Sequence, residues 1–512
     1  MKMKKAIFFL FVFLSYVPVL AQVDTAWVRR YNGLGDGGEF PSSLQVDAAG
    51  NVYVTGFTLG SSYDDYLTIK YASNGDTLWV RRYNGPFNNI DNSYDLAVDR
   101  DGNVYVTGRS RGVETSYDYA TIKYAPNGDT IWVRHYNGPI NSSDEANGIV
   151  VDDSGYVYVT GWSVDHGTLF DFVTIKYSPN GDTLWVRRYD GLLSDMPVDI
   201  KVDQAGNVYV TGTECILSLD FNCSNYATIK YAPNGDTLWV RRYDGGGNDF
   251  ASELEIGPNG NVYVTGYSWT GYSFDYLTIA YSQNGDTLWL RGYNGPGDST
   301  DEASALAVDD SGNVYVTGSS WNGTSFDYAT IKYSPNGDVL WTRQYNGPGN
   351  KTDWVSAIDV DVNGDVYITG YSMGIGRYPD YATIKYTSLG DTAWITRFDR
   401  EDINWYIAKA LSVDDSGNVY VTGYSSDGFA TIKYIQFSCI AKSGDANSDT
   451  SVLLSDIVTI INFLFKSQPA PNPLCRADAN ADGSVLLSDI VHLINFLFKS
   501  GPAPQKSREC CL

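Results

Sequence analysis

The hexapeptide NGDTLW occurs four times in this chain, at residues 74–79, 180–185, 234–239 and 284–289. One turn followed by a threonine and a tryptophan therefore recurs along most of the sequence. Close variants are NGDTIW at 127–132, NGDVLW at 336–341, LGDTAW at 389–394 and QVDTAW at 22–27.

Two other motifs recur in step with this turn. NVYVTG or a close variant begins at 51, 103, 156, 207, 261, 313, 365 and 418, and a motif of the form DYATIKY begins at 65, 118, 171, 225, 275, 327, 380 and 428. A fixed period near 50 residues that is rich in Val, Ile, Thr, Tyr and Trp predicts propeller blades rather than a helical solenoid.

One complete unit can be read from 302 to 345, as EASALAVD, NVYVTGSS, DYATIKY and DVLWTRQY. These are four short strands, which is the content of a propeller blade. The SPNG turn before the last strand places Pro where φ is near −65° and Gly where φ is positive, as a tight hairpin requires. NGDTLW is thus predicted to be the turn into the fourth strand.

The two ends of the array are complementary. A fourth strand stands alone at 24–31 (DTAWVRRY), and the array ends on a third strand at 428–437. Pairing of these strands would close a ring of eight blades and remove the open sheet edges. We therefore predict an all-β, eight-bladed propeller. The outermost strands would expose their arginine pairs on the rim, as in Arg81 with Arg82, Arg187 with Arg188 and Arg241 with Arg242.

The repeats resemble the bacterial β-propeller repeat family SBBP over residues 22–437. Their tryptophans also resemble the docking motif of eight-bladed quinoprotein dehydrogenases, in which the tryptophan of each blade packs on the next. This similarity implies a structural role for Trp27, Trp79, Trp132, Trp185, Trp239, Trp289, Trp341 and Trp394.

One face of the ring is predicted to carry the binding site. The turns on one face are short and nearly constant, whereas the loops on the other vary in length and content, and variable loops on a rigid scaffold commonly carry function. Aromatic side chains there can stack on a polysaccharide or anchor a peptide, or they can simply fill gaps between blades. The five remaining tryptophans fall on this face: Trp162, Trp269, Trp321, Trp354 and Trp405.

A second candidate feature of the ring is its set of acidic turns, such as VDRDGN at 98–103. Asp and Asn with Gly can ligate calcium, but the same residues are ordinary turn formers.

The chain begins with a basic segment and an apolar run that ends near Ala21. This pattern predicts a secretory signal peptide at residues 1–21 and therefore an extracellular or cell-surface location. A net charge of −24 disfavours nucleic-acid partners, and no later segment is apolar enough for membrane insertion. Six cysteines permit 15 disulfide arrangements, among which Cys215 with Cys223 and Cys439 with Cys475 are candidates.

After residue 437 the period breaks and a new duplication begins. The segment 444–471 is repeated at 477–504, and each copy places Asp, Asn and Asp at alternate positions, followed by Asp at position twelve. This is the spacing of an EF-hand calcium loop. In the second copy the predicted ligands are Asp478, Asn480, Asp482, Asp489 and the Ser484 carbonyl.

Two departures from an EF-hand are informative: position twelve is Asp rather than Glu, and no helix precedes either loop. Both features resemble a type I dockerin, over about residues 440–504. The resemblance implies calcium as the bound ion and a cohesin-like or other surface protein as the partner. It implies first-loop ligands Asp445, Asn447, Asp449, Ser451 and Asp456, and partner-binding positions Leu454, Ser455, Leu487 and Ser488.

The two loops differ at one position. Thr450 stands where the second copy has Gly483, a place that favours positive φ, so the first loop is expected to bind calcium more weakly. The two partner-binding pairs are identical, which would permit binding in either orientation.

Catalytic motifs are absent from the sequence: we find no nucleophile elbow, no HExxH and no phosphate-binding loop. We therefore expect a secreted, non-catalytic binding or scaffold protein. The alternatives are a polysaccharide-active enzyme carried by a dockerin, such as a glycoside hydrolase or lyase, and a structural surface protein. The predicted organisation is a signal peptide (1–21), a propeller (22–437), a linker (438–443), a dockerin-like module (444–504) and a cysteine-containing tail (505–512).

Overall fold

The chain divides into two compact units, one formed by Thr25–Ile435 and one that contains Gln436–Leu512. The predicted signal peptide lies outside the residues that the structure describes. This computed structural model describes residues 22–33, 38–59, 63–112, 115–167, 169–191, 193–215, 224–376, 378–398, 405–425, 428–437, 441–442, 444–447, 451–466, 468–471, 476–480, 484–499, 501–504 and 510–511.

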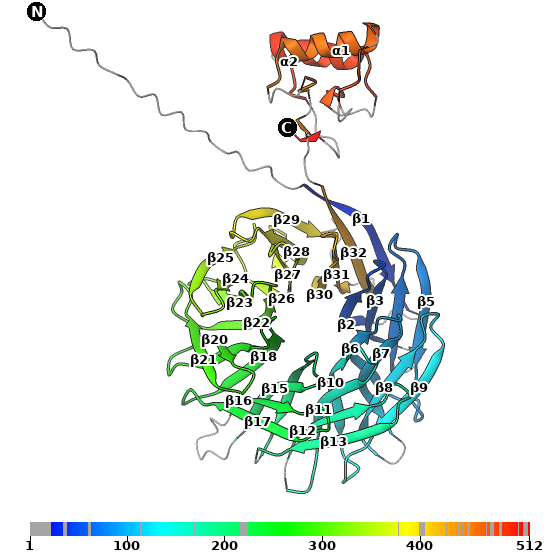
Figure 1. Ribbon diagram of the computed structural model, residues 1–512, viewed down its shortest axis with the longest axis vertical. Coiled ribbons are helices and arrows are strands. Elements are labelled where there is room, and N and C mark those ends of the chain that lie inside the picture. The colour runs from blue at the N-terminus through cyan, green and yellow to red at the C-terminus, as the bar shows by residue number, and fades with distance from the viewer. Residues whose placement is uncertain are drawn as a thin grey trace, which may run out of the picture. The chain divides into compact units, whose positions relative to one another are not determined.

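The described part of the first unit is a ring of eight antiparallel sheets with four strands each (Figure 1). The predicted eight-bladed, all-β propeller is therefore confirmed. The inner strand of each sheet lines a central channel. These strands are β2 (Glu39–Val46), β6 (Asp91–Val98), β10 (Asp144–Val151), β14 (Met196–Val202), β18 (Asp249–Ile256), β22 (Asp301–Val308), β26 (Asp353–Val360) and β30 (Tyr406–Val413).

The two middle strands of each sheet come from the NVYVTG and DYATIKY motifs. The second strands are β3 (Val52–Leu59), β7 (Val104–Arg111), β11 (Val157–Ser163), β15 (Val208–Cys215), β19 (Val262–Trp269), β23 (Val314–Trp321), β27 (Val366–Met373) and β31 (Val419–Ser425). The third strands are β4 (Asp64–Tyr71), β8 (Tyr117–Tyr124), β12 (Asp171–Tyr177), β16 (Ser224–Tyr231), β20 (Phe274–Tyr281), β24 (Phe326–Tyr333), β28 (Pro379–Tyr386) and β32 (Gly428–Phe437).

The outer strands come from the DTLWVRRY motif. In β5 (Thr77–Tyr83), Thr77 and Leu78 are exposed and Trp79 is buried, whereas the first five residues of β3 are all buried. Middle strands are buried on both faces because neighbouring sheets cover them, so their sequences are apolar without alternation. The other outer strands are β9 (Thr130–Tyr136), β13 (Thr183–Tyr189), β17 (Thr237–Tyr243), β21 (Thr287–Tyr293), β25 (Val339–Tyr345), β29 (Thr392–Phe398) and β1 (Gln22–Tyr31).

The ring is closed by its two ends. Strand β1 pairs with β32 and completes the sheet formed by β30, β31 and β32. The strand predicted from DTAWVRRY thus supplies the outer edge of the last blade. No covalent link is required, because the ladder of backbone hydrogen bonds joins the first strand of the chain to the last.

The repeated tryptophan docks each blade onto the next. The indole Nε1 of Trp79 donates to the carbonyl oxygen of Pro126 at 3.0 Å, and Lys70 Nζ donates to the same oxygen at 3.2 Å. Arg81 lies over the Trp79 ring and donates to the Gly128 carbonyl. The corresponding indole hydrogen bond to the next turn is made by Trp27, Trp132, Trp185, Trp239, Trp289 and Trp341.

The prediction that the arginine pairs are exposed on the rim needs correction, because these side chains are bound to neighbouring groups. The first arginine of each pair binds the next turn, as Arg187 does at the Gly235 carbonyl. The second is also engaged: Arg188 forms an ion pair with Asp171 at 2.6 Å. Their charges are therefore engaged in packing between blades, although the side chain of Arg242, which is paired with Glu214, remains 49% exposed.

The acidic turns between the first and second strands are satisfied within themselves. Asp47 Oδ1 accepts the backbone N–H groups of Ala49 and Asn51, each at 2.9 Å. Asp47 Oδ2 accepts Asn51 Nδ2 and the Tyr53 hydroxyl, each at 2.8 Å. One carboxylate thus accepts four hydrogen bonds. These bonds explain why Asp recurs in the turns, and no bound ion needs to be invoked.

Cys215 ends β15 and is disulfide-bonded. Its candidate partner Cys223 lies outside the described residues, as do Cys439 and Cys475.

The second unit contains two helices, α1 (Leu454–Lys466) and α2 (Leu487–Lys499), and a short parallel pair, β33 (Ala441–Lys442) with β34 (Cys510–Cys511). Neither of these described helices is long and apolar enough to cross a bilayer. The helices pack around one small core, formed by Ala446, Ile457, Ile460, Ala477, Ala479, Ile490 and Leu493.

Candidate functional site

The two predicted calcium loops have the same hydrogen-bond geometry. Asp456 is fully buried at the start of α1, and its carboxylate accepts the backbone N–H groups of Asn447 at 3.1 Å and Leu453 at 2.7 Å. Asp489 is fully buried at the start of α2 and accepts those of Asn480 at 3.2 Å and Leu486 at 2.8 Å.

Other predicted ligands lie on the same loops. Asp445 and Asp478 are also buried, so each loop encloses at least two carboxylates. Buried carboxylates require compensating charge, and an all-oxygen set suits a hard cation such as calcium. The residues present therefore fit calcium. Ser451 and Ser484 are at position seven, whereas Asp449 and Asp482 lie outside the described residues.

One contact distinguishes the first loop from the second. Arg476 Nη1 forms an ion pair with Asp445 Oδ2 at 2.8 Å and also donates to the Asp445 carbonyl at 3.3 Å. At the equivalent place before the first loop the sequence has Ser443 rather than an arginine. In the first loop, the predicted calcium ligand Asp445 is therefore already paired with the positive charge of Arg476.

The predicted partner-binding residues lie on an exposed apolar surface. Leu454 is 57% exposed and Leu487 is 59% exposed, and Ser455 and Ser488 beside them are exposed as well. The same pairing extends along both helices. Exposed apolar residues at matching positions are Leu453 with Leu486, Val458 with Val491, and Phe465 with Phe498. We call this set the helix surface.

The five predicted ligand-binding tryptophans do not form one cluster. Trp162 packs edge-on against Phe170, with ring centroids 4.5 Å apart, and Trp269 packs similarly against Phe274 at 5.1 Å. Such contacts support the gap-filling alternative at these positions. Trp405 differs, because it is 54% exposed.

Trp321 and Trp354 share one aromatic neighbour. Phe326 lies 5.2 Å from Trp321 and 5.4 Å from Trp354, in edge-to-face geometry with both. Trp354 lies in β26 directly opposite Tyr371 in β27. Among the five predicted tryptophans, Trp354 lines a cavity of the described structure, together with Tyr371.

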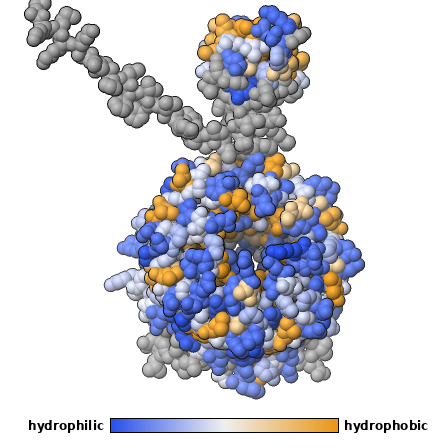
Figure 2. Space-filling model, viewed as in Figure 1, coloured by the Kyte–Doolittle hydropathy of each residue, from blue (hydrophilic) through white to orange (hydrophobic). Residues whose placement is uncertain are grey.

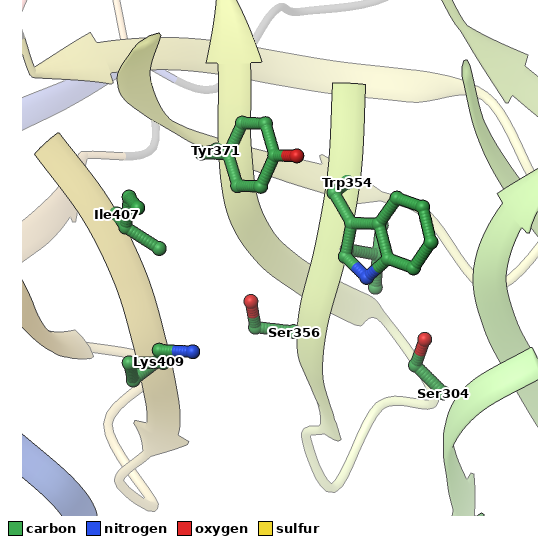
Figure 3. Close-up of a pocket in the computed structure, with 7 residues that line it drawn as sticks. Ser304, Trp354, Ser356, Tyr371, Ile407 and Lys409 are labelled. Carbon is green, nitrogen blue, oxygen red and sulfur yellow. The ribbon is translucent and has the colours of Figure 1, made fainter. Parts of the chain in front are cut away.

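That cavity, which we call the mouth pocket, has a volume of about 510 Å³. Figure 3 shows Trp354 and Tyr371 on one side, Lys409 and Ile407 projecting from β30 on the other, Ser356 between them and Ser304 beneath Trp354. This volume falls within the range of small-molecule sites. The pocket is lined by Ser304, Trp354, Val355, Ser356, Tyr371, Ile407 and Lys409.

The central channel is a second cavity, of about 580 Å³, to which all eight inner strands contribute. Figure 2 shows hydrophilic residues mixed with hydrophobic ones around the opening of the propeller. Its charges are unevenly distributed. At the residue after the bulge, β6, β14 and β18 carry Asp95, Asp199 and Glu253, whereas β22, β26 and β30 carry Ala305, Ala357 and Ala410. Two residues further along, Glu255 on β18 and Asp359 on β26 also line the channel.

The channel carboxylates bind backbone groups of the next blade. Burial raises the pKa of Glu253 to about 8 and of Asp95 to about 6. Burial alone would lower the pKa of Lys201, but Asp199 and Glu255 raise it well above its usual value. Each acceptor meets one N–H of the following inner strand: Asp95 meets Ile149, Asp199 meets Leu254, Glu253 meets Leu306 and Asp359 meets Val413.

A cluster of three carboxylates lies between two neighbouring blades, at Asp171, Asp190 and Asp195, whose oxygens lie within 4.8 Å of one another. Burial raises the pKa of Asp195 to about 6. Arg188 already supplies a positive charge at Asp171, and Cys215 N–H donates to Asp195 at 3.1 Å. The cluster is therefore part of the packing between blades.

The closed ring and the paired loop–helix units define the class: a β-propeller protein with a C-terminal loop–helix module. Four segments match the SBBP β-propeller repeat, at residues 78–112, 131–164, 289–327 and 340–376. Residues 443–498 match the dockerin type I domain. The chain thus contains SBBP β-propeller repeats and a dockerin type I domain.

Relatives and solved structures support the propeller. A WD repeat-containing protein of Acanthamoeba polyphaga mimivirus, described as uncharacterized, is 25% identical over 241 residues, which are 42% of this chain and 15% of that protein. Sqt1 of Chaetomium thermophilum, bound to the N-terminus of ribosomal protein L10, has a TM-score of 0.51 at 9% identity, covering 77% of this chain and 96% of Sqt1.

An enzyme is also among the similar structures. The quinohemoprotein alcohol dehydrogenase ADHIIG of Pseudomonas putida HK5 gives a TM-score of 0.47 at 13% identity, covering 80% of this chain and 76% of that enzyme. At these identities the similarity concerns the fold alone.

Sequence reasoning identified Trp354 but missed Tyr371, Lys409 and the channel carboxylates. A signal for Lys409 exists, because the inner-strand motif EASALAVD becomes YIAKALSVD at 406–414. Aligning the eight inner strands would have shown a lysine where the other copies have uncharged residues.

Proposed function

We propose that this chain is an exported, non-catalytic adaptor. Its dockerin module attaches to a cohesin-like protein in a calcium-dependent manner, and its propeller presents a ligand-binding face to the exterior. The predicted signal peptide supports export. The observation that carries the proposal is the combination of a closed propeller with a dockerin type I domain on one chain.

The proposed calcium ligands are Asp445, Asn447, Asp449, Ser451 and Asp456 in the first loop, and Asp478, Asn480, Asp482, Ser484 and Asp489 in the second. Burial of four of these carboxylates supports the assignment. A bound calcium ion supplies positive charge to each loop. Asp456 and Asp489 each tie their loop to the first turn of a helix, so we infer that ion binding is coupled to the orientation of α1 and α2.

The helix surface is the proposed attachment site. Leucines and phenylalanines that remain exposed in matched pairs are typical of a surface that a partner covers. Because Leu454 with Ser455 and Leu487 with Ser488 are equivalent, a partner can engage either helix as the main contact.

A non-catalytic propeller is supported by the chemistry of the mouth pocket. Its described lining offers two ionisable side chains, Lys409 and Tyr371, and neither a carboxylate nor a histidine. General acid–base hydrolysis of a glycosidic bond uses two carboxylates. The alternative of a polysaccharide-active enzyme predicts release of reducing ends from a polysaccharide panel, and the adaptor predicts none.

The attachment is tested by capture of partner proteins from the extracellular and surface fraction of the host. The baits are the full chain, Leu454→Asp, Leu487→Asp and the double variant, each with calcium and with chelator. We expect capture that requires calcium, survives either single substitution and is lost in the double variant. Trp354→Ala is the matched control and should capture as the unsubstituted chain does. Capture that persists in chelator and in the double variant would show that the module is not the attachment device.

A further inference from the structure

The eight inner strands share a β-bulge, which turns one side chain per blade toward the channel mouth. In β30 the register shifts between Ala408 and Ala410, so Lys409 is the bulged residue. A bulge re-aims a side chain and is common beside functional sites. The bulged residues of the other seven blades are Ser42, Tyr94, Asn147, Val198, Ser252, Ser304 and Ser356, so Lys409 carries the only charge among these eight positions.

An aromatic pair faces this lysine. Trp354 and Tyr371 are cross-strand neighbours, and Figure 3 shows their rings side by side at the edge of the mouth pocket. Phe326 supports Trp354 from the preceding blade. The corresponding cross-strand pair is Glu302 with Ser319 in the preceding sheet. Two other blades carry an aromatic pair in this register, Phe40 with Phe57 and Phe250 with Tyr267. The blade of Trp354 differs from them in having Lys409 on the following inner strand.

The pocket combines three kinds of group. The two aromatic rings offer a flat apolar surface that suits the C–H face of a sugar ring. Ser304 and Ser356 can exchange hydrogen bonds with sugar hydroxyls. Lys409 adds a single exposed ammonium group at the end of β30 that faces the pocket.

Charge decides which sugar fits. The described lining of the mouth pocket holds no carboxylate. Lys409 also borders the adjoining channel cavity, whose carboxylates Asp95, Asp199 and Glu253 lie on β6, β14 and β18, whereas alanines occupy that register on β22, β26 and β30. The net charge of −24 repels anions at long range, but salt screens such repulsion beyond about 8 Å at physiological ionic strength. The local field at the pocket is therefore set by Lys409 and favours an anion.

We propose that the mouth pocket binds an acidic sugar residue of a polysaccharide, with its ring on Trp354 and Tyr371 and its carboxylate on Lys409. This inference rests on the proposed binding role of the propeller face and specifies its ligand class. A protein ligand is the competing occupant, and the experiment separates the two.

The test compares trimers of galacturonate and of glucuronate with their methyl esters, which keep the sugar ring and remove the charge. Isothermal titration calorimetry of the full chain should give tighter binding of at least one acid than of its ester, by roughly two- to fivefold, as expected for one exposed ion pair. Lys409→Met should abolish this difference while leaving ester binding unchanged. Trp354→Ala should weaken acid and ester alike, by more than about tenfold.

Matched controls are available on the same face. Trp405→Ala removes an exposed tryptophan outside the pocket, and Lys351→Met removes an exposed lysine outside it; both should bind as the unsubstituted chain does. Thermal melting checks that Trp354→Ala is folded, because Trp354 packs on Phe326. Lys409 is exposed, so its variant tests the proposal independently of folding.

Three outcomes would overturn the proposal: no binding of any trimer at millimolar concentration, equal binding of acid and ester, or capture of a host protein that depends on Trp354. If the sugar-binding proposal fails, calcium-dependent capture by the helix surface is still expected. Its failure can therefore be distinguished from failure of the attachment proposal.

Discussion

The indole of Trp79 and the carbonyl oxygen of Pro126 are joined by a 3.0 Å hydrogen bond that connects one blade to the next. The same oxygen accepts Lys70, and Arg81 holds the adjoining Gly128 carbonyl. A single turn is therefore bound by three side chains of the preceding blade. This contact explains why the turn and the tryptophan recur together in the sequence.

Removing the indole donor should destabilise the ring. Trp79→Phe leaves the Pro126 carbonyl with one donor fewer and opens a small cavity, and we expect a loss of about 2 kcal/mol in the free energy of unfolding. Urea denaturation followed by tryptophan fluorescence measures it. Trp405→Ala, at an exposed position, should cost less than about 0.5 kcal/mol. Equal effects of the two substitutions would contradict a docking role for Trp79.

Strand β1 should be indispensable for the closed ring. Deleting residues 22–31 leaves β32 with an unpaired edge, and exposed edges promote association. We expect a lower melting temperature and oligomers in size-exclusion chromatography with light scattering. Deleting residues 438–512, which belong to the other compact unit, is the control and should leave the melting of the propeller unchanged. A monomeric, equally stable protein without β1 would show that closure is dispensable.

The two calcium loops should differ in affinity, with the second the tighter. The first loop has Thr450 in place of Gly483, and its Asp445 carboxylate is shared with Arg476. Calcium titration by calorimetry should give two phases. Asp489→Ala should remove the tight phase and Asp456→Ala the weak one. Loss of the tight phase in Asp456→Ala instead would reverse the assignment.

Arg476 itself offers a more specific test. Arg476→Gln releases the Asp445 carboxylate from its ion pair, so calcium should bind the first loop several-fold more tightly, because one charge no longer competes for the ligand. The same substitution should leave the second loop unaffected. Weaker binding by the first loop would indicate that Arg476 orients Asp445 rather than competing with the ion.

Stability should fall as pH rises through neutrality. Burial raises the pKa of Glu253 from 4.5 to about 8, so between these values the folded chain binds a proton that the unfolded chain has lost. The free energy of unfolding must then decrease with pH over this window. Lys201, whose pKa is raised, contributes stability below its usual pKa of 10.5 and so does not oppose the trend.

Glu253→Gln should make this dependence shallower and stabilise the protein at pH 8, because the amide oxygen can still accept the Leu306 N–H. Chemical denaturation at pH 5 and pH 8 measures both effects. Glu302→Gln is the comparison on the same ring, since burial raises the pKa of Glu302 as well but this carboxylate lies outside the channel cavity, and it should change the slope less. An unchanged slope in Glu253→Gln would rule out this carboxylate as the source.

The eight blades and their closure could be predicted because every cue is local. A turn such as SPNG fixes its own geometry, and each strand is short enough to be recognised from a few residues. The calcium-loop residues could be predicted for the same reason, since their ligands follow one another within one loop. The free arginine rim was wrong because the acceptors of Arg81 and Arg187 lie in the next blade.

The sequence by itself determined the repeat, the number of blades and the two loop–helix units, since these depend on contacts between residues close in the chain. Only the tertiary structure decided that Trp354, Tyr371 and Lys409 line one pocket. The β-bulge before Ala410 selects which residue of β30 faces the channel mouth, and packing of β30 against β26 brings that residue to the aromatic pair. The bulge depends on the pairing of β30 with β31 within one sheet, and the meeting of Lys409 with the aromatic pair depends on contacts between separate sheets. The lysine is visible in the sequence, but its neighbours across the pocket are not.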